Sequence, residues 1–256
     1  MIYVTGDTHG SFEKFALVNF PEQDNLTKDD YVIICGDFGI WDDSTRERVN
    51  FDWLEHKKFT TLFVDGNHEN YDLLNAYPVE KWHGGEVHFI RPSVIHLMRG
   101  NLFEIEGKKI FTMGGASSHD IQDGILDPND PEFKKKRRKL DRSGRYYYRI
   151  KGQSWWEEEL PTEEEIEKAR RTLDSCNWEV DYIFSHCAPF SLVEQCLGYR
   201  EDNRLTRFFD EVCAKGKFEY WFFGHYHENY MLSEKFFLLY GKIFEIPKEH
   251  FGFSDN

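Results

Sequence analysis

The sequence predicts an α/β fold built around a parallel β-sheet. Three apolar segments in the first third of the chain, Ile2–Thr5, Tyr31–Cys35 and Thr61–Val64, have the composition of buried strands. Segments with helical spacing lie between them, and a polar, glycine-containing motif follows each one. A strand–helix–strand order of this kind predicts parallel strands joined by right-handed crossovers.

Two helices are expected between these strands. Phe12–Phe20 can form a short helix that ends at Pro21, because proline cannot continue a helix. Ser44–Lys57 also has helical spacing, with Ser44 as a candidate N-cap. Its apolar residues are expected to share one face: Val49, Trp53 and Leu54.

The middle of the chain changes character. Asn101–Ile105 and Lys109–Met113 are predicted to form a hairpin. From Ala116 to Glu159 the sequence is polar, charged and without clear periodicity. A segment this long without its own pattern is typical of a functional excursion, so we expect an inserted lid over about residues 116–160 of a single domain, residues 1–256.

The last third returns to regular elements. Thr162 and Glu165 form a capping box that begins a helix reaching about Cys176. The remaining expected elements are a strand at Asp181–Ser185, helices at Phe190–Leu197 and Asn203–Ala214, a strand at Glu219–Phe223, and a closing hairpin of Phe236–Tyr240 with Lys242–Ile246 around Gly241. No internal repeat or flexible linker divides the sequence.

Composition excludes several classes of protein. Hydrophobic residues make up 40% and charged residues 30%, which is typical of a globular domain. The formal charge of −14 opposes nucleic-acid or anionic-membrane binding over the whole surface, although a local basic groove stays compatible with it. Five cysteines without a Cys-x-x-Cys pair favour reduced thiols. Because no signal peptide and no bilayer-spanning apolar run are visible, we expect a cytoplasmic protein without membrane association, and the oligomeric state stays open.

Five short polar motifs follow predicted strands. They are Asp7-Thr8-His9-Gly10, Gly36-Asp37, Gly66-Asn67-His68-Glu69, Ser185-His186 and Gly224-His225-Tyr226-His227. Ligand sites gather at the carboxyl ends of strands in α/β sheets, so these motifs are expected to converge. Asp, Asn and His suit Mn²⁺, Fe²⁺ or Zn²⁺. A carboxylate shared by two such ions would hold them roughly 3.5–4 Å apart, as in two-metal hydrolases.

The order D-x-H, G-D, G-N-H-E, H, G-H-x-H resembles the signature of calcineurin-like metallophosphoesterases over residues 5 to 227. The resemblance implies an α+β sandwich of four layers, in which helices flank two mixed β-sheets. It implies a first metal site of Asp7, His9, Asp37 and His227. It implies a second site of Asp37, Asn67, His186 and His225, with Asp37 bridging the two ions.

The resemblance also implies an activity, namely hydrolysis of phosphate esters. Two divalent ions are expected, with Mn²⁺ preferred over Fe²⁺, Zn²⁺ or Mg²⁺. A metal-bridging hydroxide would attack phosphorus, and His68 would approach the leaving-group oxygen. The expected catalytic residues are therefore His68 and Asp37. The expected substrate is a phosphodiester or phosphomonoester of nucleotide type.

Substrate contacts are expected from the motifs and from the lid. The candidates are Asn67, His68, His119, Arg142 and Arg145. Each motif residue taken alone could instead be a helix cap or turn residue, and only their combination favours a metal site. The basic run Lys134–Lys139 is either a solvated surface or a clamp for a nucleotide or nucleic acid.

Three alternatives remain within this interpretation. Protein phosphatases of the superfamily extend the second motif to G-D-x-x-D-R-G, whereas this chain reads Gly36-Asp37-Phe38-Gly39-Ile40-Trp41-Asp42. The second Asp and the Arg are absent, which weakens the protein phosphatase alternative. A nuclease would differ only in substrate. A non-catalytic scaffold is disfavoured because no motif residue is missing.

Overall fold

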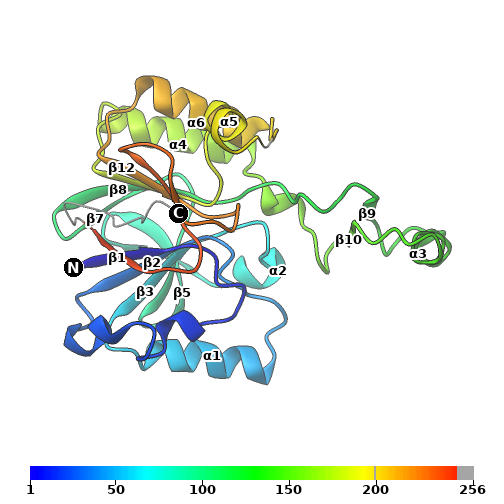
Figure 1. The fold of residues 1–256 in the computed structure, drawn as a ribbon, viewed down its shortest axis with the longest axis horizontal. Helices are drawn as coiled ribbons and strands as arrows, with labels where there is room; N and C mark the ends of the chain where they lie inside the picture. The colour runs from blue at the N-terminus through cyan, green and yellow to red at the C-terminus, as the bar shows by residue number, and fades with distance from the viewer. Residues whose placement is uncertain (199, 247–256) are drawn as a thin grey trace.

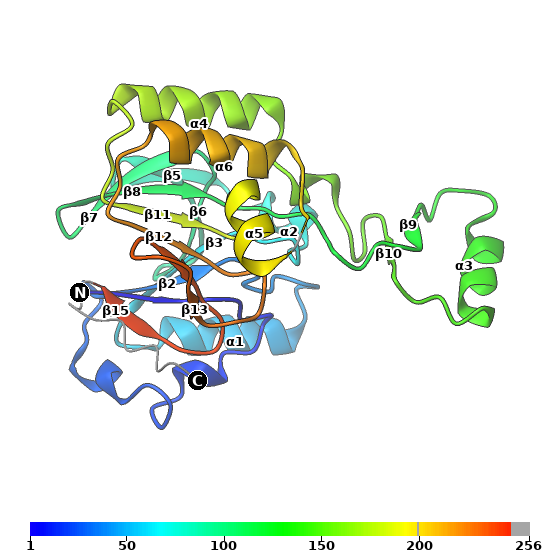
Figure 2. The same cartoon turned by 45° about the horizontal axis from the view of Figure 1, so that its top comes forward.

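Two β-sheets pack face to face with helices on their outer faces, as Figures 1 and 2 show for the computed structural model, which describes residues 1–198 and 200–246. The first sheet has the order β15-β1-β2-β3-β6-β5-β4. Its strands are β1 Ile2–Thr5, β2 Tyr31–Cys35, β3 Thr60–Val64, β4 Val79–Trp82, β5 Gly85–Arg91, β6 Val94–Leu97 and β15 Phe244–Ile246. β1, β2, β3 and β6 pair in parallel, which confirms the predicted parallel core.

The second sheet has the order β13-β14-β12-β11-β8-β7. Its strands are β7 Asn101–Ile105, β8 Lys108–Met113, β11 Tyr182–Ser185, β12 Tyr220–Phe223, β13 Tyr230–Met231 and β14 Phe236–Leu238. β7 and β8 form the predicted hairpin. β8, β11, β12 and β14 pair in parallel, whereas β7 and β13 pair antiparallel at the two edges, so this sheet is mixed.

The predicted closing hairpin is wrong. β14 pairs with β12 in the second sheet, whereas β15 pairs with β1 in the first. The chain crosses between the sheets over residues 239–243, where the Thr5 hydroxyl donates to the carbonyl oxygens of Tyr240 and Lys242 at 3.3 and 2.8 Å. β14 and β15 therefore pair with distant strands and not with each other across the predicted turn at Gly241.

Helices cover the two outer faces. α1 Thr45–Glu55 lies outside the first sheet, and α4 Glu163–Ser175 and α6 Arg204–Lys215 lie outside the second (Figure 1). Two shorter helices complete the body: α2 Tyr71–Leu74 and α5 Phe190–Leu197. The Thr162 capping box is formed as predicted. This arrangement confirms the expected four layers.

The helix predicted near the N-terminus is wrong. Phe12–Phe20 forms only a 3₁₀ turn over Glu13–Phe15, and a second 3₁₀ turn follows at Pro21–Asn25. Tertiary contacts override helix propensity here, because the Lys14 ammonium donates to three backbone carbonyls, those of Gly6, Asp7 and Tyr240. The turn therefore ties the N-terminal segment to the loop that carries Asp7.

Helix α1 begins at the predicted Ser44 cap, whose Oγ accepts from the Glu47 N–H at 3.3 Å. Of its expected buried face only Leu54 is buried, because Val49 and Trp53 are 59% and 40% exposed. Phe51 is buried beside Leu54, and the Phe51 ring stacks on Phe38 at 5.4 Å. An aromatic core beneath the helix selects this rotation.

Apolar layers fill the space between the sheets and beneath the helices. Along β2, Ile33 and Cys35 face the space between the sheets, and Val32 and Ile34 face the core beneath α1. Full burial on both faces explains why this strand is continuously apolar. All five cysteines are free thiols.

A long arm leaves the body after β8 and returns before α4. It contains β9 Gly124–Leu126 and β10 Tyr148–Ile150, which pair in parallel, and α3 Phe133–Arg142 at its far end (Figures 1 and 2). The basic run Lys134–Lys139 lies on α3, although the sequence predicted no regular element there. α3 contains no buried residue, so no apolar stripe could have revealed it.

Candidate metal centre

The carboxyl ends of β1, β2, β3, β11 and β12 carry the five motifs. Hydrogen bonds link motifs that are distant in sequence: the His225 N–H donates to Asp7 Oδ1 at 2.9 Å, and the His68 N–H donates to Asp37 Oδ1 at 2.8 Å. Both sheets therefore contribute to one site, at the edge where parallel strands end.

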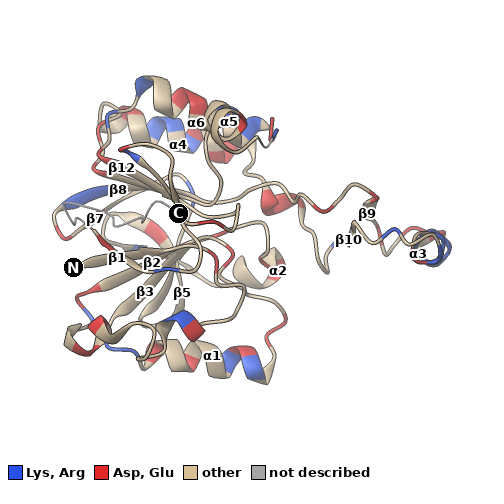
Figure 3. Cartoon of the chain, in the orientation of Figure 1, with Lys and Arg blue, Asp and Glu red and all other residues tan. Residues whose placement is uncertain are grey.

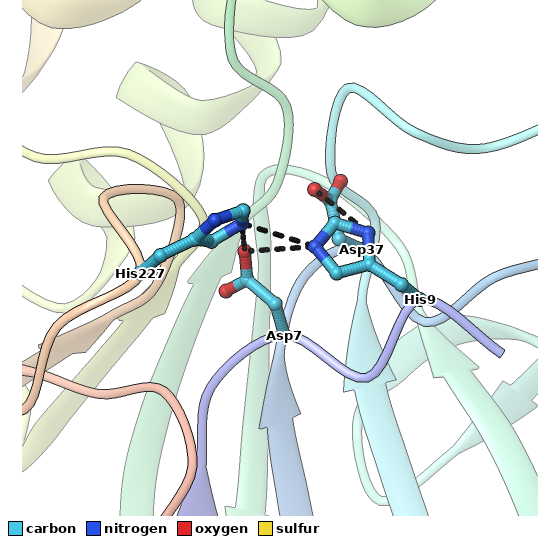
Figure 4. A group of neighbouring side chains, drawn as sticks. All are labelled: Asp7, His9, Asp37 and His227. Atoms are coloured by element: carbon cyan, nitrogen blue, oxygen red, sulfur yellow. Dashed lines mark hydrogen bonds and ion pairs between the residues drawn. The ribbon is translucent and has the colours of Figure 1, made fainter. Parts of the chain in front are cut away.

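A first group of side chains gathers from β1, β2 and the β12–β13 loop. Its members are Asp7, His9, Asp37 and His227, whose candidate ligand atoms all lie within 4.8 Å of one another (Figure 4). His227 Nε2 lies 3.1 Å from Asp7 Oδ2 and 3.0 Å from His9 Nε2. His9 Nδ1 lies 3.7 Å from Asp37 Oδ2.

The donor set of this first group fits a divalent cation. Asp7 Oδ2 is buried and accepts no well-formed hydrogen bond, although a buried polar atom normally finds a partner. The facing Nε2 atoms of His9 and His227 have room for only one proton between them. Carboxylate oxygen and imidazole nitrogen are ligands that Mn²⁺, Fe²⁺ and Zn²⁺ accept. A cation would satisfy these converging lone pairs together.

A second group surrounds His186, whose side chain is fully buried. Its Nδ1–H donates to the Cys35 carbonyl at 2.8 Å, which directs Nε2 toward Asp37 Oδ1 and Asn67 Oδ1, each at 3.2 Å. Burial lowers the pKa of His186, but the Asp37 carboxylate outweighs it and raises the pKa to about 10. Without a metal, the His186 imidazole is therefore protonated, because the Asp37 carboxylate stabilises positive charge at this position, as it would that of a metal cation.

His225 lies between this second group and His119. Its ring centroid is 4.9 Å from that of His186 and 4.5 Å from that of His119, and the His119 and His225 Nε2 atoms are 2.5 Å apart. Glu201 Oε2 lies 3.6 Å from His225 Nε2. Together His119, Glu201 and His225 form a further group, whose candidate ligand atoms lie within 4.8 Å of one another. Glu201 follows no strand motif, so sequence reasoning missed it.

Four candidate ligands adopt left-handed backbone conformations. The φ angles are +47° for His9, +46° for Asp37, +70° for His225 and +55° for His227. Such conformations cost non-glycine residues roughly 1–3 kcal/mol each and cluster at functional sites. The backbone is therefore strained where the side chains converge.

Two motif glycines leave room for a carboxylate from another motif. A Cβ on Gly66 would stand 2.0 Å from Asp37 Oδ1, and one on Gly224 would stand 2.1 Å from Asp7 Oδ1. These distances are far below any real carbon–oxygen contact. Glycine is required at both positions because the backbone packs directly against the buried carboxylates.

Glu69 organises the loop after Asp37. Its side-chain oxygens accept the backbone N–H groups of Phe38, Gly39 and Ile40 at 2.6, 3.1 and 2.9 Å. Burial raises the pKa of Glu69 to about 8, although these three N–H groups oppose that shift. Sequence reasoning gave this residue no role, since the loop it supports is distant in sequence.

A pocket of about 240 Å³ opens beside the two groups. It is lined by Asp37, Asn67, His68, His119, Asp120, His225, Tyr226 and His227. Burial is the largest influence on the pKa of His68 and lowers it to about 4. The unliganded imidazole is therefore neutral at neutral pH.

Arg149 on β10 approaches this pocket from the base of the arm. Its Nη2 lies 3.5 Å from His68 Nε2, and its guanidinium donates to both Asp120 oxygens at 2.8 and 2.6 Å. Arg142 and Arg145, the expected phosphate contacts, instead lie at the far end of the arm and are exposed. The sequence offered no means of choosing among arginines of the arm, because only the β9–β10 pairing decides which one returns.

A comparison with known families now adds to this geometry. The family model for calcineurin-like phosphoesterases matches residues 1–229. The chain belongs to the calcineurin-like phosphoesterase family. Comparison with curated proteins finds no match. Within residues 1–198 and 200–246, no helix combines the length and apolarity needed to cross a membrane.

Proposed function

We propose that this calcineurin-like phosphoesterase is a metal-dependent hydrolase of phosphate esters with a dinuclear centre. The observation that carries the proposal is the first group, in which four ligand atoms lie within 4.8 Å of one another beside the His68 pocket. We further propose a phosphodiester or phosphomonoester of nucleotide type as the substrate and the cytoplasm as the location of the enzyme.

The first ion would be held by Asp7, His9, Asp37 and His227. The second would be held by Asp37, Asn67, His186 and His225, so Asp37 would contact both. Two bound divalent cations, preferably Mn²⁺, would lower the pKa of a water molecule and neutralise charge on the substrate phosphate. The buried Asp7 Oδ2, which accepts no well-formed hydrogen bond, and the oxygen atoms that face His186 Nε2 support cation binding at both positions.

His68 and Arg149 would act on the substrate from the other side of the pocket. An arginine guanidinium binds phosphate oxygens in a bidentate manner, and Asp120 orients that of Arg149. The negative charge of a bound phosphate would favour the protonated form of His68. Protonated His68 would then donate to the leaving-group oxygen. Arg149 would thereby supply a positive charge in a chain whose Gly36-Asp37 motif is not followed by the Arg of the protein phosphatase pattern.

Turnover of bis-p-nitrophenyl phosphate and p-nitrophenyl phosphate tests the proposal. We expect Mn²⁺-dependent hydrolysis of at least one ester, which a chelator abolishes. Asp37→Asn should abolish both hydrolysis and metal loading, whereas Asp29→Asn, at an exposed site, should change neither. Purified protein that binds Mn²⁺ but hydrolyses neither ester would favour the scaffold alternative.

A further inference from the structure

The far end of the arm concentrates positive charge in an otherwise acidic protein. Residues 133–145, here called the basic tip, hold eight of the 32 Lys and Arg residues but one of the 46 Asp and Glu residues. The basic tip therefore carries a formal charge of +7, and the rest of the chain carries −21. Figure 3 shows this contrast, with α3 mostly blue at the end of the arm.

Most charges of the basic tip are not neutralised within the described structure, where only Lys135, Lys136 and Arg145 have ion-pair partners. Lys135 pairs with Glu132 at 2.7 Å, and Lys136 pairs with Asp130 at 2.5 Å. Within residues 1–198 and 200–246, no ion pair involves the five other cations of α3: Lys134, Arg137, Arg138, Lys139 and Arg142. The positive charge is therefore available to an external anion.

Neither packing nor local electrostatics explains why α3 is so basic. The helix buries no side chain. Lys134, Arg138 and Arg142 follow one another at i, i+4 and i+8, so they form a stripe about 12 Å long on one side of the helix. Like charges at this spacing destabilise a helix. A bound polyanion would remove that repulsion.

Aromatic side chains lie close to α3, where the Tyr146 hydroxyl donates to the Asp141 carbonyl at 3.4 Å. Tyr146 and Tyr147, directly after the basic tip, are 69% and 63% exposed. Exposed aromatic rings beside a positive surface are the combination on which bases of a single strand stack while cations hold the phosphates. An acidic protein surface would use the charges but would have no use for the rings.

We propose that the basic tip, with Tyr146 and Tyr147, binds single-stranded nucleic acid. Phosphates contact the Lys134–Arg138–Arg142 stripe, and bases stack on the two tyrosines. β10 then leads from these tyrosines to Arg149 at the pocket, so a strand held at the tip is directed toward the metal centre. That last step rests on the proposed function, whereas binding at the tip does not.

Fluorescence anisotropy with a labelled oligothymidine tests the binding. The protein is kept metal-free with a chelator, so that no hydrolysis intervenes. We expect Lys134→Gln/Arg138→Gln/Arg142→Gln to weaken binding at least tenfold at about 50 mM salt, and to reduce the slope of log affinity against log salt by about 2. A matched triple variant removes three lysines that are 56%, 70% and 76% exposed on the body: Lys58→Gln/Lys81→Gln/Lys217→Gln. It should bind like the wild type.

A second variant separates stacking from charge. Tyr146→Leu/Tyr147→Leu should weaken oligothymidine binding at least about fivefold but leave heparin binding unchanged. The proposal would be overturned if the leucine variant lost affinity equally for oligothymidine and heparin. It would also be overturned if the protein bound duplex more tightly than single strand, or if the glutamine variant kept wild-type affinity. A change of molar mass by light scattering in the glutamine variant would overturn it as well, because it would assign the tip to a second copy of the chain. Hydrolysis assays fail or succeed independently of this binding.

Discussion

Substituting Gly66 with alanine would test the packing that holds the shared carboxylate. The added Cβ would stand 2.0 Å from Asp37 Oδ1 and 2.4 Å from the Asp37 backbone nitrogen. The φ angle at Gly66 lies outside the left-handed region, so alanine is compatible with the local backbone. The perturbation is therefore a steric contact directed at one residue, Asp37.

The effect can be worked from these distances. Because a backbone atom is involved, the contact cannot be relieved by a side-chain rotation alone, and Asp37 must shift by about 1–1.4 Å to restore an ordinary separation of 3.4 Å. A displacement of that size in a catalytic group costs roughly 10²-fold in rate. Overpacking a core site costs typically 1–3 kcal/mol of folding free energy. The same shift would separate Asp37 Oδ1 from the His68 N–H, now at 2.8 Å.

The assay is Mn²⁺-dependent hydrolysis of bis-p-nitrophenyl phosphate, combined with urea unfolding of the same preparation. We expect Gly66→Ala to remain folded, to lose about 10²-fold in turnover and to need more Mn²⁺ for half-maximal rate. Gly241→Ala is the control, because no atom lies within 4 Å of its added Cβ. Wild-type turnover and metal dependence in a folded Gly66→Ala protein would refute the proposed role of Asp37.

Three further outcomes are expected. His68→Asn should lower kcat roughly 10²–10⁴-fold without changing the Mn²⁺ concentration for half-maximal rate. Steady-state kinetics over a Mn²⁺ series measure both quantities, and a changed Mn²⁺ requirement would indicate a metal ligand rather than a residue that acts on the leaving group. Arg149→Gln should raise KM more than it lowers kcat. Asp120→Asn should give a smaller change in the same direction. An effect on kcat alone would contradict substrate binding by Arg149. Burial raises the pKa of Glu159 from 4.5 to about 8, so the folded protein retains a proton that the unfolded chain releases. The free energy of unfolding should then fall as pH rises between about 4.5 and 8, by up to about 1.4 kcal/mol per pH unit, and urea titrations should show a smaller fall in Glu159→Gln.

The sequence predicts best those elements whose pattern is local. β2 is apolar throughout, and the capping box at Thr162 is complete within four residues, so both lie where they were expected. Elements that depend on distant partners were predicted less well. β14 and β15 are adjacent in sequence, yet each satisfies its backbone in a different sheet. β4, β5 and β6 were missed because short strands of mixed polarity have no distinctive period.

The candidate site divides in the same way. The strand–motif junctions indicated which side chains would meet, because parallel strands end at one edge of their sheet. The supporting residues needed coordinates. Glu69 acts through three backbone N–H groups, and Arg149 reaches His68 only because β9 pairs with β10. The roles of Glu69 and Arg149 depend on contacts between segments distant in sequence, so no local sequence motif predicts them.

Strain and unsatisfied polarity coincide at one point of the fold. Left-handed conformations at His9, Asp37, His225 and His227 each disfavour folding. Asp7 Oδ2 adds a buried oxygen without a well-formed hydrogen bond. A structure that only needed to be stable would replace these residues with smaller or apolar ones. Because each of these costs falls on a residue of a candidate ligand group, the cation binding proposed above would account for them together.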